Sequence, residues 1–516
     1  MTDSLHDSGT FGQLIVSAIA RFGDRPAIAD DRQAWSYADL GDAIARAVAV
    51  FKTLGLVRGD GVAMAVGNRI EQVACLYAAM LLGLRYTALH LLAAQDSHLF
   101  ILNDAEVAAL IFDPAALGDR ASAYQQRTAC LTHMLSLGES SAGCDMLALM
   151  AAATPAALKD EANAADIAHL MYTSGTTGVP KGVMLPHRTL ITAALHQAAD
   201  WDLPEGEIRF LAATPITHAS GWIIPTVLMR GGFVRLATGF DAEPFCAQIA
   251  AERINLVFLV PTMIYGLLDH PTLQRHDLSS LQTVVYGAAP ISAGRLAHAI
   301  GVFGSIFVQL FGQTEAPMCI TTLRKADHDP ARVNRFGSAG LPCPAVQVRL
   351  FDTTMNEVPV GQPGEICVRG PLVMDGYWKQ PDATSEAFAG GWLHTGDVAV
   401  RSVEGYLQIV DRTKDLIISG GFNIYPREVE DALLAHPDVS AAAVIGVPHD
   451  IWGEAVTAFV VPRSAGAVDA AVLKRHVRDA RGPIWSPKSV TFVEAIPLTA
   501  LGKVDRQALR KLAAIT

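Results

Sequence analysis

The residues most able to do chemistry lie in one stretch, residues 172–182, which reads YTSGTTGVPKG. This stretch combines four aliphatic hydroxyl side chains and three glycines with a single lysine. Glycine lets backbone N–H groups approach a ligand closely, hydroxyls donate further hydrogen bonds, and the lysine adds a mobile positive charge. The stretch therefore predicts a loop that wraps an anion such as a phosphate.

Two other interpretations of this loop explain less. A Walker A loop needs the spacing G-x-x-x-x-G-K-[S/T], but counting from Gly175 puts Pro180 at the second glycine, and Gly182 follows Lys181. A plain surface turn would explain the hydroxyls and glycines, but not the Pro-Lys-Gly ending directly behind an apolar run. That run, residues 167–172, predicts a buried strand. The loop should therefore leave the end of a sheet, where phosphate loops lie.

The stretch resembles the signature loop of the adenylate-forming enzymes, the superfamily of acyl-CoA synthetases, luciferases and peptide-synthetase adenylation domains. Further motifs resemble that superfamily in the same order along the chain. They are TPITHASGW (214–222), VVYGAAPIS (284–292), IFVQLFGQTE (306–315), WLHTGD (392–397), DRTKD (411–415), GGFNIYP (420–426) and PLTALGKVDR (497–506). Each is weak alone, because T-G-D is also ordinary turn chemistry and a run of charges is also a solvated turn.

The resemblance implies ATP, Mg²⁺ and coenzyme A as ligands. Phe311 would stack on adenine in place of the family's tyrosine, and Thr314 would donate to the α-phosphate. Glu315 and Thr176 would hold Mg²⁺, a hard cation that accepts oxygen ligands. Asp397 would bind the ribose. The implied nucleotide and coenzyme A set is Thr173, Ser174, Gly175, Thr177, Gly178, Lys181, Gly287, Ala288, Ala289, Gln309, Phe311, Gly312, Thr314, Asp397, Ile409, Arg412, Gly420 and Gly421.

The lysine near the C-terminal end is implied to act in catalysis. In the family this lysine, here Lys503, enters the active site during adenylation, and lysine suits the task as a long, flexible point charge. Rotation of a C-terminal domain at the hinge Lys414 would withdraw it and bring Gly420 and Gly421 to the pantetheine channel. The implied catalytic residues are Lys503, Thr176, Glu315 and His218.

His218 bears on the substrate. A lone histidine is more often a structural hydrogen-bonding residue, but a histidine in this P-x-x-H-x-x-G setting lines the acyl pocket of acyl- and aryl-CoA ligases. Amino-acid-activating domains usually carry an aspartate there, so an amino acid is disfavoured. The implied pocket residues are His218, Gly221, Trp222, Gly287 and Gly312, which suggest a roomy, largely apolar pocket for a fatty or aryl acid.

Composition limits the class of protein. A chain of 516 residues is too long for a single hydrophobic core, so we expect two or more domains. Apolar residues make up 51% and charged residues 18%, so a large core is available. The net charge of −11 argues against a nucleic-acid binder. Seven cysteines without a C-x-x-C pair suit a reducing cytoplasm. We expect no signal peptide and no transmembrane segment, and a homodimer is possible.

The elements that must position these residues alternate between strands and helices. Strands at 61–66 and 107–112 flank a helix at 70–82, and Ser36 should cap an earlier helix whose apolar face is Leu40, Ile44, Val48 and Phe51. Such alternation indicates α/β layers with a largely parallel sheet. Residues 337–370 suggest a small β-barrel-like subdomain.

The expected fold is therefore α/β. A large N-terminal domain, residues 1–411, has two α/β layered subdomains and the β-barrel-like subdomain. A small mobile α+β C-terminal domain, residues 412–516, acts as a lid. The resemblance implies an AMP-forming acyl-CoA synthetase that activates a fatty or aryl acid. The alternative is an adenylate-forming enzyme that passes the acyl group to a carrier protein. A nucleotide-binding switch would need Walker spacing, which is absent.

Overall fold

The computed structural model describes residues 9–118, 120–173, 180–412, 415–419, 422–449, 452–464, 466, 468–498 and 504–513. The chain divides into two compact units. The larger unit comprises residues 1–348 and 368–393, and the smaller unit comprises residues 349–367 and 394–516. The predicted boundary between residues 411 and 412 lies inside the smaller unit and stays a prediction. Within the described ranges, no helix is both long and apolar enough to cross a membrane.

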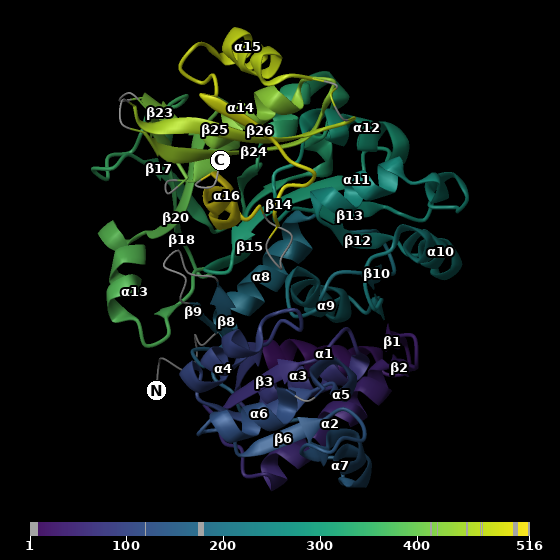
Figure 1. The fold of residues 1–516 in the computed structure, drawn as a ribbon. Helices are drawn as coiled ribbons and strands as arrows, with labels where there is room; N and C mark the ends of the chain where they lie inside the picture. The colour runs from purple at the N-terminus through teal and green to yellow at the C-terminus, as the bar shows by residue number, and fades with distance from the viewer. Residues whose placement is uncertain are drawn as a thin grey trace. The chain divides into compact units, whose positions relative to one another are not determined.

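The first sheet of the larger unit has the strand order β19-β9-β8-β4-β3-β5-β6-β7. Figure 1 labels β9, β8, β3 and β6 of this sheet. Its strands pair in parallel from β8 to β7, while β9 and β19 run antiparallel to their neighbours. The strands are β3 (Gly61–Ala65), β4 (Arg85–Ala88), β5 (Val107–Phe112), β6 (His133–Ser136), β7 (Cys144–Asp145), β8 (Ile167–Thr173), β9 (Lys181–Pro186) and β19 (Gly376–Tyr377).

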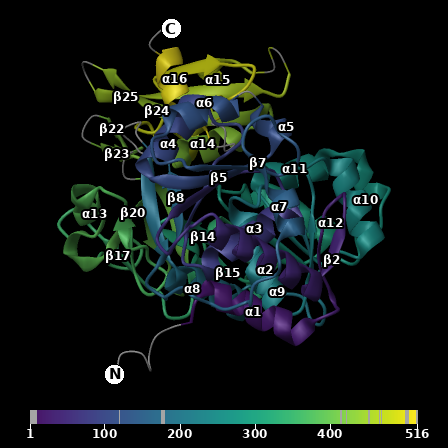
Figure 2. The same cartoon turned by 90° about the horizontal axis from the view of Figure 1, so that it is seen from below.

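Helices cover this sheet, and the sequence explains where they begin. Ser36 caps α2 through a reciprocal capping box with Asp39, which confirms the predicted cap. The predicted apolar face of α2 is buried. α1 packs against α2, α3, α8 and α9 (Figures 1 and 2). The helices of this part are α1 (Phe11–Phe22), α2 (Tyr37–Thr53), α3 (Ile70–Leu81), α4 (Gln95–Asp104), α5 (Pro114–Leu117), α6 (Arg120–Arg127) and α7 (Met146–Ala152).

The second sheet of the larger unit has the order β16-β15-β14-β13-β12-β10-β11-β1-β2. It is parallel from β14 to β1 and antiparallel at both ends. Its strands are β1 (Pro26–Ala29), β2 (Ala34–Ser36), β10 (Arg209–Ala212), β11 (Phe233–Leu236), β12 (Leu256–Leu259), β13 (Thr283–Tyr286), β14 (Phe307–Gln313), β15 (Ala316–Leu323) and β16 (Leu341–Pro342). Its helices are α8 (His187–Asp200), α9 (Ala219–Met229), α10 (Ala242–Glu252), α11 (Pro261–Asp269) and α12 (Ala293–Phe303).

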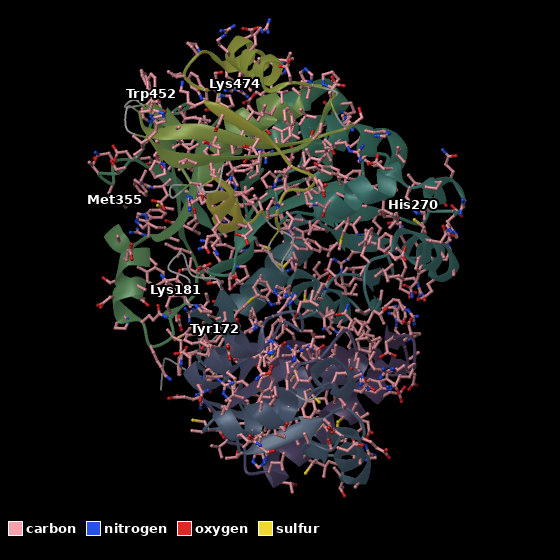
Figure 3. The ribbon with its side chains drawn as sticks, in the orientation of Figure 1. Tyr172, Lys181, His270, Met355, Trp452 and Lys474 are labelled. Atoms are coloured by element: carbon pink, nitrogen blue, oxygen red, sulfur yellow. The ribbon has the colours of Figure 1, made fainter. Side chains whose placement is uncertain are left out.

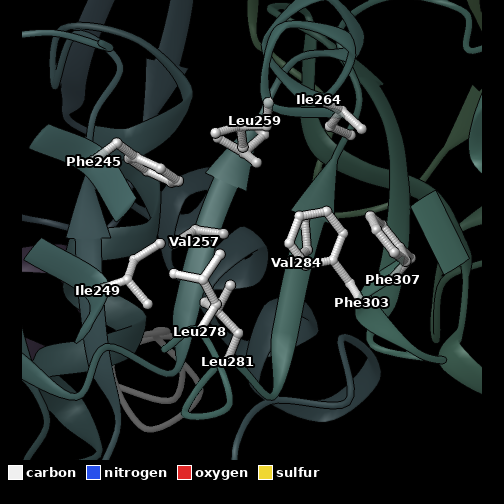
Figure 4. A pocket seen from close by; sticks show the side chains of 11 residues that line it. Phe245, Ile249, Val257, Leu259, Ile264, Leu278, Leu281, Val284, Phe303 and Phe307 are labelled. Atoms are coloured by element: carbon white, nitrogen blue, oxygen red, sulfur yellow. The ribbon is translucent and has the colours of Figure 1, made fainter. Parts of the chain in front are cut away.

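One pocket lies inside the core on this second sheet. Figure 4 shows side chains from β12, β13, β14 and the neighbouring helices around it, among them Phe245, Leu259 and Phe307. All of the residues that line it are apolar, and none of them is a predicted site residue. This pocket is therefore a packing gap in the core and offers no polar group to orient a ligand.

Two sheets build the remainder of the chain. Their orders are β17-β18-β20-β21 and β23-β22-β25-β24, with β26 on β25. The strands are β17 (Gln347–Phe351), β18 (Pro363–Arg369), β20 (Leu393–Arg401), β21 (Leu407–Arg412), β22 (Ile417–Ser419), β23 (Phe422–Ile424), β24 (Val439–His449), β25 (Gly453–Pro462) and β26 (Ser489–Phe492). The helices are α13 (Pro381–Ala387), which belongs to the larger unit, and α14 (Pro426–Leu434), α15 (Ala470–Arg481) and α16 (Arg506–Ala513).

The buried histidine His187, at the start of α8, gives a testable pH dependence. Its Nδ1 accepts a hydrogen bond from the backbone N–H of Phe11 at 3.1 Å, and burial lowers the pKa of His187 to about 4. The unfolded chain binds this proton below about pH 6.5, so stability is lost as the pH falls from 6.5 towards 4. At pH 5 the loss from this group is about 2 kcal/mol.

We expect His187→Gln to lose less stability than the wild type between pH 7.5 and pH 5, as measured by urea unfolding. Glutamine can still accept the Phe11 N–H but does not titrate. The exposed His298 offers a matched control, since His298→Gln should keep the wild-type pH dependence. An unchanged pH dependence in His187→Gln would contradict this account.

Candidate active site

The predicted phosphate loop connects two strands that pair with each other. β8 and β9 are antiparallel, with Thr173 opposite Lys181 and Tyr172 opposite Gly182. Figure 3 labels Tyr172 on β8 and Lys181 on β9. A strand therefore follows the loop directly, whereas in a Walker loop a helix follows. The loop residues Ser174, Gly175, Thr176, Thr177 and Gly178 lie outside the described residues.

Lys181 and Glu315 are brought together by a tyrosine that the sequence analysis did not identify. The Lys181 Nζ lies 4.8 Å from the ring centroid of Tyr377, and the Tyr377 hydroxyl donates to Glu315 Oε1 at 2.9 Å. Burial, with the neighbouring Glu315 charge, raises the pKa of Tyr377 well above its usual value, so the phenol stays a donor. A cation and a carboxylate thus share one fixed aromatic side chain.

Strand direction explains why distant motifs meet. β10, β13 and β14 belong to one parallel run, so their carboxyl ends lie at the same edge of the sheet. The segment that leads to His218 follows β10, the turn 287–289 follows β13, and Thr314 and Glu315 follow β14. The structure therefore places these predicted residues at one edge of one sheet.

The turn 287–289 presses its backbone against β14. A Cβ atom on Gly287 would lie 2.6 Å from the carbonyl oxygen of Leu310, so only glycine fits there. Ala288 has φ +65°, a left-handed conformation that costs a non-glycine residue on the order of 1 kcal/mol. Ala288 and Ala289 are exposed, and Gln309 of β14 lies opposite Tyr286 in the strand register. The turn offers a thin, exposed backbone beside β14.

Packing within a β-hairpin explains why residue 312 is a glycine. A Cβ atom on Gly312 would lie 2.4 Å from the backbone nitrogen of Met318, which itself has φ +57°. The close approach of the two strands of the β14–β15 hairpin therefore requires glycine at this position. Its presence does not by itself indicate a roomy acyl pocket, and that interpretation stays a prediction. Phe311 is half-buried on the same strand.

His218 lies at the start of α9 among aromatic side chains. Its Nδ1 is 2.9 Å from the Thr217 hydroxyl, and its ring meets the ring of His90 edge-on at 5.4 Å. One turn along α9, Trp222 meets His169 edge-on with centroids 6.1 Å apart. Burial lowers the pKa of His90 and brings that of His169 to about 3, so neither imidazole carries charge near neutral pH.

Gly221 lies between His218 and Trp222 and is fixed by packing. A Cβ atom there would lie 1.8 Å from the carbonyl oxygen of Ile216. Glycine therefore lets α9 begin close against the preceding loop, which sets the directions of His218 and Trp222. Neither His90 nor His169 is among the site residues predicted from the sequence. The apolar strand patterns around them gave no signal for a role in the site.

The predicted ribose residues form an ion pair within the smaller unit. Asp397 and Arg412 lie opposite each other on β20 and β21, and the Arg412 Nε lies 3.0 Å from Asp397 Oδ1. Asp397 is buried and Arg412 is partly exposed, and the ion pair fixes the position of the carboxylate. Ile409 lies on β21, where it is the register partner of Ala399 on β20. This arrangement presents one fixed carboxylate and one cation from neighbouring strands.

The remaining predicted residues Lys414, Gly420, Gly421 and Lys503 lie outside the described residues, although the segments that flank Lys503 are described. Leu498 forms a β-bridge with Val504, and the Asp505 N–H donates to the Pro497 carbonyl at 2.8 Å. Arg506 then begins α16. The ends of the Lys503 segment are thus tied to each other.

Most of the chain matches two family models and several known enzymes. Residues 16–378 match the family model of the AMP-binding enzymes, and residues 428–503 match that of the AMP-binding enzyme C-terminal domain. The chain is 40% identical over 513 residues to a medium/long-chain fatty acid–CoA ligase of Mycobacterium tuberculosis, covering 97% of this chain and 89% of the relative. It is 42% identical over 348 residues to a feruloyl-CoA synthase of an Amycolatopsis species, covering 67% of this chain and 70% of the relative.

Two solved structures resemble this structure over nearly the whole chain. The amide bond synthetase McbA of Marinactinospora thermotolerans has a TM-score of 0.90 at 34% identity, covering 98% of this chain and 100% of its own. ATP-bound MatB of Rhodopseudomonas palustris has a TM-score of 0.89 at 30% identity, covering 97% of this chain and 98% of its own. Both the fold class and the resemblance expected from the sequence are confirmed.

Proposed function

The chain belongs to the AMP-binding enzyme family, and from that premise we propose that it is an AMP-forming acyl-CoA synthetase, an acid–thiol ligase. The observation that carries the proposal is the match of both family models, supported by identity to acyl-CoA ligases across nearly the whole chain. The geometry that supports it is the Lys181–Tyr377–Glu315 cluster, in which one tyrosine contacts both a carboxylate and the lysine that begins β9, the strand after the predicted phosphate loop.

In the first half-reaction, the substrate carboxylate attacks the α-phosphorus of ATP. One carboxylate oxygen forms a bond to phosphorus, and the bond from phosphorus to the β-phosphate oxygen breaks, releasing pyrophosphate. Negative charge grows on the phosphate oxygens, so donors that are already in place lower the barrier. We assign this task to the loop with Lys181, to Thr314 and to Lys503.

Glu315 fits Mg²⁺, because its carboxylate offers the oxygen ligands that this ion prefers and is oriented by Tyr377. Glu315 and Thr176 would hold the ion, which when bound neutralises phosphate charge. The turn 287–289 with Phe311 would border the adenine, and Asp397 would bind the ribose.

In the second half-reaction, the thiol of coenzyme A attacks the carbonyl carbon of the acyl-adenylate. A carbon–sulfur bond forms, the bond from carbon to the bridging oxygen breaks, and AMP leaves while the thiol proton passes to solvent. We propose that residues 412–516 turn about Lys414 between the two half-reactions, which replaces Lys503 by Gly420 and Gly421. The two arrangements must then lie within a few kcal/mol for ligands to switch them.

The proposed substrate is a fatty or aryl carboxylic acid, in keeping with the fatty acid and feruloyl relatives. The test is a panel of such acids with ATP and Mg²⁺, followed by AMP formation with coenzyme A, with an amine, and with neither. Acyl-CoA and AMP in equal amounts support the proposal. AMP that requires the amine instead would favour the chemistry named for McbA, and AMP with a loaded carrier protein alone would favour the carrier alternative.

The seven cysteines are all free, which supports our proposal of a reducing, cytoplasmic compartment. A homodimer stays a prediction, which light scattering of the purified protein would check.

Tyr377→Phe should raise the Mg²⁺ concentration needed for half-maximal adenylation about tenfold, because the variant loses the hydrogen bond to a charged carboxylate. Phenylalanine keeps the ring face beneath Lys181, so Tyr377→Leu should be more impaired than Tyr377→Phe. Pyrophosphate exchange at varied Mg²⁺ measures both variants. Identical behaviour of phenylalanine, leucine and the wild type would remove Tyr377 from the site.

A further inference from the structure

A glutamate, a cysteine and a histidine converge between two strands of the smaller unit. Glu365 and Cys367 lie on β18, and His394 lies near the start of β20, which neighbours β18 in the sheet. Their ligand atoms are a carboxylate oxygen, the Cys367 Sγ and a ring nitrogen, and all lie within 4.8 Å of one another. Within the described part of the chain, no other group of three or more histidine, cysteine or acidic side chains meets this condition.

Strand geometry brings these three side chains to one place. Glu365 and Cys367 are two residues apart on β18, so their side chains project from the same face of the sheet. The His394 Nδ1 lies 2.8 Å from Glu365 Oε2 and 3.6 Å from the Cys367 Sγ. One ring nitrogen therefore faces both a carboxylate and a thiol, and an ion bound to this nitrogen would be within reach of both.

The separations fit a tetrahedral zinc ion. Zinc binds cysteine sulfur at about 2.3 Å and histidine nitrogen at about 2.0–2.1 Å, so two such ligands at the tetrahedral angle lie about 3.6 Å apart. This is the distance between the Cys367 Sγ and the His394 Nδ1. A carboxylate oxygen and a ring nitrogen on the same ion lie about 3.4 Å apart, so Glu365 Oε2 would need to move away from Nδ1 by about 0.6 Å.

The carboxylate is already oriented, and the group can be reached from solvent. The backbone N–H of Gly396 donates to Glu365 Oε1 at 2.9 Å, which leaves Oε2 for an ion and supplies the outer hydrogen bond that is typical of metal ligands. The side chains of Glu365 and His394 are 22% and 19% exposed, whereas Cys367 is buried. An ion would therefore enter from the side of Glu365 and His394, and water would complete its coordination.

The three ligand types select the class of ion. Sulfur and imidazole nitrogen suit Zn²⁺ and Co²⁺, whereas Mg²⁺ prefers oxygen ligands alone. Burial raises the pKa of the Cys367 thiol to about 12, so the metal-free protein carries a protonated thiol. A coordinating thiol is deprotonated, so binding of the ion releases this proton to solvent as the sulfur–metal bond forms.

We propose that Glu365, Cys367 and His394 form a zinc site that links β18 to β20. This inference goes beyond the proposed function and does not depend on it. Asp397 directly follows Gly396, whose N–H bonds to Glu365, so the ion would also steady the segment that carries the predicted ribose carboxylate.

The experiment titrates the full chain, first freed of metal with a chelator, with Co²⁺ as the probe. We expect a thiolate-to-cobalt charge-transfer band that saturates at about one ion per chain, disappears when Zn²⁺ is added and persists in excess Mg²⁺. Cys367→Ser should abolish the band, and His394→Gln should weaken cobalt binding about tenfold or more. Zn²⁺ should raise the melting temperature of the wild type by about 3 °C or more and leave that of Cys367→Ser unchanged.

Cys130→Ser is the matched control, because Cys130 is an exposed free thiol in the larger unit. This variant should keep the wild-type band. If Cys367→Ser fails to fold, His394→Gln carries the test. A wild type without the band, a band that survives in Cys367→Ser, or a band lost in Cys130→Ser would overturn the inference and leave the ligase function intact. Absence of acyl-CoA formation beside an intact band would instead count against the proposed function alone.

Discussion

Replacing Lys503 by alanine should nearly abolish adenylation while leaving thioester formation from pre-made acyl-adenylate largely intact. In the proposed mechanism Lys503 contacts the carboxylate and the α-phosphate only while pyrophosphate is leaving. Removing one such electrostatic contact typically costs on the order of 3 kcal/mol, or about a hundredfold or more in rate. Pyrophosphate exchange measures the first half-reaction, and coenzyme A consumption with synthetic acyl-adenylate measures the second.

Lys511 supplies the control for this experiment, because it is exposed on α16 a short distance beyond the Lys503 segment. Lys511→Ala removes the same charge from the same region and should leave both half-reactions near the wild-type rate. If Lys503→Ala slows both half-reactions to the same extent, the assignment of Lys503 to adenylation alone is wrong.

Glu315→Gln should lower the rate of adenylation about a hundredfold, and excess Mg²⁺ should restore part of it. Glutamine keeps the shape and can still accept the Tyr377 hydroxyl, so the change removes the charge and little else. A neutral amide binds Mg²⁺ far more weakly than a carboxylate, so the phosphate charge is less well neutralised. The measurement is the rate of pyrophosphate exchange as a function of Mg²⁺ concentration.

The exposed Glu139 serves as the control, since Glu139→Gln removes one negative charge from the same unit without touching the site. It should show the wild-type Mg²⁺ dependence. A Glu315→Gln variant with wild-type rates at every Mg²⁺ concentration would remove Glu315 from the metal site.

Local patterns in the sequence predicted most of the elements that carry the site. The apolar runs before the phosphate loop and before Thr314 are β8 and β14, and the helix capped by Ser36 is α2. Parallel pairing then explains why turns far apart in sequence lie at one edge. These outcomes follow from hydrophobic periodicity and capping, which neighbouring residues determine.

Among the strands that were not predicted, β9 and β15 have sequences that resemble loops. β9 reads KGVMLP, with a glycine and a proline around a short apolar run, and β15 begins with Ala-Pro directly after the motif that ends at Glu315. Both run antiparallel to the strand before them, so both motifs lie in hairpins. Glycine and proline favour a turn in isolation. Pairing with the neighbouring strand overrides that preference here.

Contacts between distant residues could not be predicted from one sequence. Tyr377 reaches Glu315 across 62 residues, through the pairing of β19 with β9. His169 and Trp222 meet because a strand and a helix from different parts of the chain pack together. Gly312 is a different case, because a residue type can have more than one cause. The sequence suggested that this glycine makes room in the acyl pocket, but its closeness to Met318 gives a packing reason for it.

The most direct test of the central claim is the fate of the carboxylate oxygen. The enzyme would be supplied with ATP, Mg²⁺, coenzyme A and an accepted acid carrying ¹⁸O in both carboxylate positions, and the products analysed by mass spectrometry. If the carboxylate attacks the α-phosphorus and the thiol then expels AMP, each AMP carries one ¹⁸O and pyrophosphate carries none. Label in pyrophosphate or phosphate, or unlabelled AMP formed together with acyl-CoA, would contradict an acyl-adenylate.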